Sequence, residues 1–130
     1  MDCKNNECCL GKGVKILTVG GYRVIEDIKE GEEIITDDYK IVKVTKIGRF
    51  KYTGILYTLP KEYHKSRPFE EMKISRTHKY RISGKWRIPK KHLAEYKVEN
   101  EMIYHLEVEG NKNMIANGIV VESWKENKIL

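Results

Sequence analysis

The chain has 130 residues and a mass of 15.3 kDa, which predicts a single domain. With 40% hydrophobic and 34% charged residues it can bury a core, which excludes a disordered chain. The net charge of +6 comes from 25 Lys and Arg interleaved with 19 Asp and Glu, so the charge alone does not demand a nucleic-acid partner.

No stretch of the sequence approaches the roughly 18 consecutive apolar residues that a membrane-spanning helix needs. The opening residues MDCKNNEC also lack the apolar segment of a signal peptide. We therefore expect a cytoplasmic monomer with no membrane partner.

All three cysteines, Cys3, Cys8 and Cys9, lie at one end of the chain. An odd, one-ended set is a poor disulfide framework. Cys3 and Cys8 with a distant histidine could hold zinc, and a single cysteine is commonly a small buried hydrophobe. The third interpretation is that one cysteine is a nucleophile. We favour this interpretation, and we expect neither a metal ion nor a cofactor.

From residue 14 onward, apolar residues recur with a period of two. Residues 14–19 (VKILTV) and 41–47 (IVKVTKI) show the alternation that is typical of strands. Turn signals separate such runs at Gly20-Gly21, Glu30-Gly31, Asp37-Asp38, Ser83-Gly84 and Gly110-Asn111. Many short strands with frequent turns predict an all-β domain.

Two short segments favour a helical turn and one favours a loop. Residues 25–28 are long enough for one turn, and residues 89–96 could hold another, with Pro89 near its first position. Residues 60–68 lie between two prolines, break the strand pattern and predict an exposed loop. His64, in this loop, and His92 match no motif and are expected at the surface.

Three motifs stand out because of their order and spacing. CLGKG at residues 9–13 leads into a strand, SRTH at residues 75–78 lies in the strand-like run 72–82, and YHLEV at residues 104–108 continues into NMIANGIVV at 113–121. Together they resemble the Hint family, the self-processing fold of inteins, Hedgehog C-terminal domains and bacterial intein-like domains.

The resemblance implies an all-β horseshoe-like disk of long, bent antiparallel strands, built from two similar halves related by a pseudo-two-fold axis. Residues 14–59 and 72–121 fit such halves. The resemblance also divides the chain into an upstream flanking segment at 1–8, a Hint domain at 9–123 and a C-terminal tail at 124–130.

In this family the first cysteine of the domain attacks the carbonyl of the residue before it. Here the resemblance places the Cys9 sulfur on the carbonyl carbon of Cys8, which converts a peptide bond into a thioester. It implies that His78 protonates the departing nitrogen. Ser75, at a position where the family usually has Thr, would help hold the scissile carbonyl or His78 itself. Strand residues three apart face opposite sides, so Ser75 and His78 can share a site only through a twist, bulge or turn.

His105 follows Tyr104 at the place where many family members have Asp. By resemblance His105 could act as the base for the Cys9 thiol. The alternative is a strand residue that faces solvent or packs on Tyr104.

The C-terminal end departs from the intein pattern. Inteins finish with His-Asn followed by Cys, Ser or Thr, and the Asn side chain cyclises to cut the second junction. Glu122 and Ser123 stand where His and Asn would be, and neither offers a side-chain amide. The sequence therefore predicts cleavage at the Cys8–Cys9 bond without splicing, with the chain's own upstream segment as substrate and water, a thiol or another nucleophile as acyl acceptor.

Two other functions remain open. One is a Hint fold that has lost its chemistry and serves as a binding or structural module. The other is a basic β-barrel that binds nucleic acid through its eight tyrosines and Lys-rich strands. We expect no specific nucleic-acid binding, because Lys on the solvent face of half-buried strands explains the same pattern.

Overall fold

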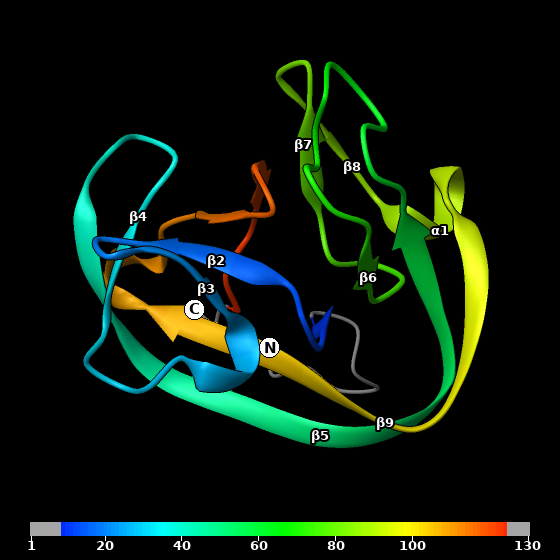
Figure 1. The fold of residues 1–130 in the computed structure, drawn as a ribbon, viewed down its shortest axis with the longest axis horizontal. Helices are drawn as coiled ribbons and strands as arrows, with labels where there is room; N and C mark the ends of the chain where they lie inside the picture. Colours follow the sequence, from blue (N-terminus) through cyan, green and yellow to red (C-terminus); the bar gives the residue numbers. More distant parts are fainter. Residues whose placement is uncertain (1–8, 125–130) are drawn as a thin grey trace, which may run out of the picture.

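The computed structural model describes residues 9–124, which form one antiparallel sheet (Figure 1). In chain order its elements are β1 (Leu10–Gly11), β2 (Lys15–Thr18), β3 (Gly21–Val24), a 3₁₀ turn (Ile25–Asp27), β4 (Glu33–Ile35), β5 (Ile41–Leu59), β6 (Met72–Ile74), β7 (Tyr80–Ile82), β8 (Lys85–Arg87), α1 (Pro89–His92), β9 (Ala94–Val108), the turn Glu109–Asn111, β10 (Met114–Ala116) and β11 (Ile119–Val121). The all-β prediction is confirmed. None of the helices in the described part of the chain is long and apolar enough to cross a membrane.

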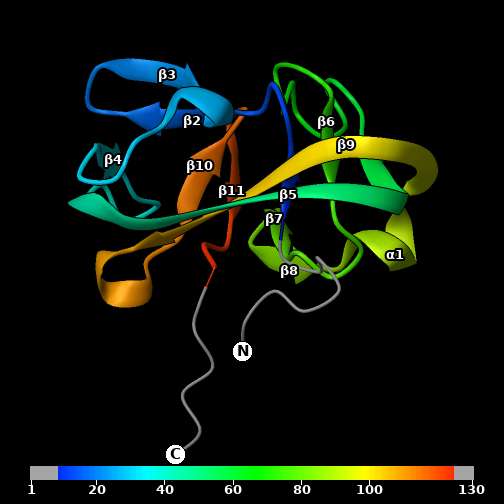
Figure 2. The same ribbon diagram turned by 90° about the horizontal axis from the view of Figure 1, so that it is seen from below.

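Strands β5 and β9 form the frame of the molecule. They pair antiparallel along nearly their whole length, from Val44 opposite Val108 to Thr58 opposite Ala94. Figures 1 and 2 show the two strands side by side, sweeping around the outside as a horseshoe. The bend coincides with irregular register between Tyr52 and Gly54, as expected where a bulge increases local twist.

The helix predicted at residues 89–96 is shorter than expected. Helix α1 begins at Pro89, as its fixed φ allows, but ends at His92. Ala94 already pairs with Thr58 on β5, so the last three residues of the predicted helix belong to a strand. The 3₁₀ turn near residue 25 and the loop after residue 59 agree with the sequence.

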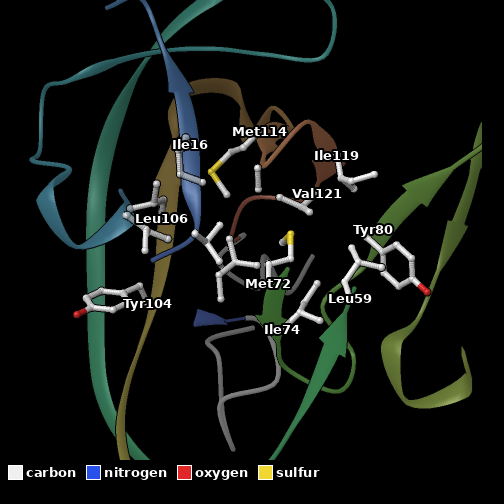
Figure 3. Close-up of a cluster of buried hydrophobic side chains, with 14 of the residues drawn as sticks. Ile16, Leu59, Met72, Ile74, Tyr80, Tyr104, Leu106, Met114, Ile119 and Val121 are labelled. Carbon is white, nitrogen blue, oxygen red and sulfur yellow. The ribbon is translucent and has the colours of Figure 1, made fainter. Parts of the chain in front are cut away.

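The main core lies inside the horseshoe, where side chains from opposite arms meet (Figure 3). Ile16 of β2, Leu106 of β9 and Val121 of β11 are fully buried there. Buried positions alternate with more exposed ones in β2 and β11, whereas Leu106 belongs to a run of four buried residues, 103–106, in β9. The two-residue period read from the sequence is therefore the period of core packing in β2 and β11.

A second, smaller cluster brings the two ends of the described chain together. It contains Cys9, Leu56, Val98, Ile103 and Trp124, with Phe50 and Tyr52 packed against it. Trp124, the first residue of the expected tail, is only 6% exposed, so it is part of the folded core. Cys9 at the predicted cleavage site and Trp124, which directly follows Ser123, therefore share one apolar environment.

Candidate active site

Ser75 holds the backbone of Cys9 with three hydrogen bonds. The Cys9 N–H donates to Ser75 Oγ at 2.7 Å, and Ser75 Oγ donates to the Cys9 carbonyl oxygen at 3.0 Å. The Ser75 N–H donates to the same carbonyl at 3.0 Å. The Cys9 nitrogen belongs to the Cys8–Cys9 peptide bond, so the Ser75 hydroxyl is hydrogen-bonded to one atom of that bond. Cys8 itself lies outside the described residues.

A turn joins Ser75 to His78 and solves the geometric problem of their spacing. Strand β6 ends at Ile74, and the His78 N–H donates to the Ser75 carbonyl at 3.2 Å. The SRTH motif therefore lies in a tight turn between β6 and β7 instead of inside one continuous strand. This turn brings residues 75 and 78 to the same region, which an extended strand would not do.

His78 is buried, with 1% of its surface exposed, and contacts the C-terminal segment at Glu122, where the second junction of an intein would be. Its Nε2 lies 2.7 Å from the carbonyl oxygen of Glu122. A carbonyl oxygen only accepts, so Nε2 carries the proton and donates. In the neutral ring the lone pair is then on Nδ1, which makes Nδ1 the basic atom of His78.

His105 is packed between aromatic rings. It stacks on Trp124 with ring centroids 4.4 Å apart and planes at 14°, and it lies 5.3 Å from the ring of Phe50. Burial is the largest cause that lowers the pKa of His105 from 6.5 to about 4, and the positive charges of His78 and Lys46 contribute in the same direction. His105 is therefore neutral at pH 7 and weakly basic.

This pKa predicts a loss of stability in acid. The unfolded chain binds a proton at His105 below about pH 6.5, whereas the folded chain does so only near pH 4, so the free energy of unfolding falls as the pH drops between these values. We expect a loss of about 3 kcal/mol over this range. Denaturant unfolding of the Cys9→Ala chain at several pH values measures it. His105→Phe keeps the stacking and should remove this part of the dependence; an unchanged pH slope would refute the assignment.

Gly48 gives the His105 ring its room. Gly48 of β5 pairs with His105 of β9, and a Cβ at position 48 would lie 2.3 Å from His105 Nε2. No real Cβ contact is that short, so the imidazole or the strand would have to move. An isolated glycine inside an alternating strand is a sequence signal of such a close approach.

Gly48→Ala is expected to destabilise the fold by about 1–3 kcal/mol through overpacking. Thermal or denaturant unfolding measures the change. Gly20→Ala is the matched control, because its nearest non-neighbouring atom would be 3.8 Å away and its cost should be small. The double variant Gly48→Ala/His105→Ala should recover part of the loss. Equal stability of the two glycine variants would show that the ring moves without cost.

Ser123, at the second expected junction, is buried and donates from Oγ to the carbonyl oxygen of Lys112 at 2.7 Å. Lys112 directs its ammonium group to Asp38 at 3.0 Å. The backbone N–H of the next residue, Trp124, donates to the Leu106 carbonyl at 2.7 Å. Hydrogen bonds thus fix Ser123 to Lys112 and Trp124 to β9.

The structure joins Cys9, Ser75, His78 and Glu122 through hydrogen bonds, and His105 joins them through Trp124 of the Cys9 cluster. Sequence reasoning missed Gly48, Trp124 and the carbonyl role of Glu122. Among residues 9–124, no three metal-ligating side chains come together in a metal-binding group. The zinc alternative used Cys3 and Cys8, which lie outside that range.

Comparison with known proteins finds similarity in structure only. No protein-family model and no curated protein matches the sequence. A bacterial intein-like domain from Clostridium thermocellum superposes with a TM-score of 0.72 at 15% identity, covering 89% of this chain and 99% of that one. A variant of the Ssp DnaB mini-intein gives 0.68 at 19% identity, covering 93% and 98%. The MchDnaB-1 intein gives 0.66 at 12% identity, covering 88% and 99%.

These superpositions cover most of this chain and nearly the whole of each neighbour. Inteins and intein-like domains thus share with this chain the horseshoe of bent antiparallel strands. The chain has the Hint fold of inteins and bacterial intein-like domains.

Proposed function

We propose that the chain carries out an intramolecular N-to-S acyl shift at the Cys8–Cys9 peptide bond. The observation that carries the proposal is the grip of Ser75 on the Cys9 N–H at 2.7 Å, because this nitrogen is the leaving group of the reaction. A positioned hydroxyl at the leaving nitrogen and an imidazole one turn away are the parts that such a transfer needs.

The reaction moves one proton from sulfur to nitrogen. Cys9 Sγ attacks the carbonyl carbon of Cys8 through a five-membered ring, the C–N bond breaks, and the Cys9 nitrogen becomes a free amine. The thiol must lose a proton and the amine must gain one. Nδ1 of neutral His78 can take the first proton and deliver it to the nitrogen, while Nε2 remains hydrogen-bonded to Glu122.

His105 fits the role of base less well than the sequence suggests. With a pKa of about 4 it holds a thiol proton poorly near neutral pH. Its stacking on Trp124 supports a different role, which is to fix the C-terminal segment that carries the Glu122 carbonyl. In the proposal His105 is therefore a positioning residue.

The thioester is resolved by water, a small thiol or another nucleophile, and the upstream segment is released. Splicing is not part of the proposal, because Glu122 and Ser123 have no side-chain amide to cyclise. The Ser123 hydroxyl donates to the Lys112 carbonyl. The activity therefore has the chain's own N-terminal segment as its substrate.

A second candidate is an inert Hint module, and the complete burial of Cys9 in an apolar cluster favours it. Incubation with dithiothreitol, followed by intact-mass measurement, separates the two. Thiol-dependent loss of the first eight residues is expected for the acyl shift. An unchanged mass after long incubation identifies the inert module.

A further inference from the structure

A pocket of about 410 Å³ lies where three hairpins meet, and none of its lining residues belongs to the site described above. Its walls come from residues 64, 65 and 67 of the loop between β5 and β6, residues 81–84 of β7–β8, and residues 118–120 of β10–β11. Figure 1 shows the loop and the β7–β8 hairpin rising side by side. We call this the three-hairpin pocket. Its volume is within the range of small-molecule sites.

Each hairpin closes with a two-residue turn in which both central residues have positive φ. Asn117-Gly118 and Ser83-Gly84 use the residue types that such type I′ turns favour. The third turn has Lys65 and Ser66, with φ of 49° and 65°. Lysine is a strained choice here, and strained backbone residues concentrate at binding sites.

Hydrogen bonds hold the three hairpins to one another. The Phe69 N–H donates to the Asn117 carbonyl at 3.0 Å, and Asn117 Nδ2 donates to the Glu70 carbonyl at 3.1 Å. Ser83 Oγ and His64 Nε2, both from residues that line the pocket, are 2.7 Å apart. The pocket is therefore preorganised before any ligand arrives.

The charge of the lining has one sign. Lys65, Arg67 and Arg81 contribute three cations, and none of the described residues that line the pocket carries a carboxylate. Arg81 is partly neutralised by Asp37 at 3.1 Å, but within residues 9–124 neither Lys65 nor Arg67 forms an ion pair. A Cβ on Gly118 would lie 3.8 Å from Arg67 Cγ, so the Arg67 stem lies against the β10–β11 turn.

We propose that the three-hairpin pocket binds a phosphate group carried by a small molecule. The guanidinium group of Arg67 and the ammonium group of Lys65 supply two charges that are not neutralised by the described residues. Guanidinium and ammonium groups are the usual partners of phosphate oxygens. The proposal is independent of the acyl shift, because it uses none of the same residues.

The test is a titration of the full-length Cys9→Ala chain with pyrophosphate, in which the chemical shifts of the backbone amides are monitored by NMR. Shifts are expected at residues 65, 83, 84 and 118. Arg67→Ala should weaken binding about tenfold, which is the scale of one charge-assisted hydrogen bond. Lys65→Asn should weaken binding similarly while it keeps or raises thermal stability, since Asn tolerates positive φ better than Lys.

Two control variants distinguish binding at a specific site from nonspecific attraction of pyrophosphate to the positively charged chain. Lys51→Ala removes an exposed cation on β5, away from the pocket lining, and Ser66→Gly relaxes the same turn without loss of charge. Both should bind pyrophosphate within about twofold of the parent. Equal weakening by Lys51→Ala, or no shift at the pocket amides, would overturn the proposal.

A single-stranded oligonucleotide without a terminal phosphate distinguishes the source of the phosphate. Weaker binding than pyrophosphate is expected, because a phosphodiester carries one charge per group. Tighter binding, with a steep salt dependence that Arg67→Ala reduces, would replace the small molecule by nucleic acid as the occupant and overturn the proposal as stated.

Discussion

Cys9→Ala is expected to abolish release of the upstream segment. Alanine has no nucleophilic atom, so the thioester cannot form. The variant keeps the Cys9 backbone N–H and carbonyl that bind Ser75, so the local fold should persist. Intact mass before and after incubation with thiol measures the effect, and circular dichroism reports whether the fold is retained.

Cys8→Ala is the matched control, because it changes the neighbouring cysteine and leaves the proposed nucleophile in place. It should cleave at a rate close to that of the parent. The reverse pattern, with Cys8→Ala inactive and Cys9→Ala active, would move the nucleophile by one residue.

His78→Ala is expected to slow the acyl shift by about a hundredfold or more, the usual scale for loss of a general acid–base group. The substitution removes the proton carrier and also leaves the partly buried Glu122 carbonyl without the donor that lies at 2.7 Å. Single-turnover cleavage with thiol, followed by mass, measures the rate.

His78→Gln separates the two effects of this substitution. The longer side chain of glutamine can place its amide nitrogen near the position of Nε2 and donate a hydrogen bond to the Glu122 carbonyl, but it cannot carry a proton. We expect it to recover stability relative to His78→Ala while it remains as slow. A rate within about threefold of the parent for either variant would remove His78 from the mechanism.

The strand pattern was predictable from sequence wherever one face of a strand meets the core. Residues 14–19 and 41–47 alternate because Ile16 and Val44 point into the core. The start of β9 carries no such signal. Residues 94–97 are all exposed, so no hydrophobic period marks them as strand, and Pro89 favoured a helix.

The parts of the site were predictable to different degrees. Motif order brought Cys9, Ser75 and His78 together, and their mutual hydrogen bonds fit that grouping. The surroundings of His105 were not predictable, because Trp124 meets it from a distant segment. The Glu122 acceptor is a backbone carbonyl, a group that every residue possesses and that therefore leaves no signature in sequence.

The proposed reaction forms a thioester between Cys8 and Cys9, and hydroxylamine tests this bond directly. At neutral pH hydroxylamine attacks thioesters and leaves ordinary amides intact. Mass spectrometry of the treated chain should find a fragment of residues 1–8 that ends in a hydroxamate and a second fragment that begins at Cys9. The parent chain should give both fragments and Cys9→Ala neither. An intact parent chain, or a fragment that ends only in a carboxylate at every hydroxylamine concentration, would contradict the acyl shift.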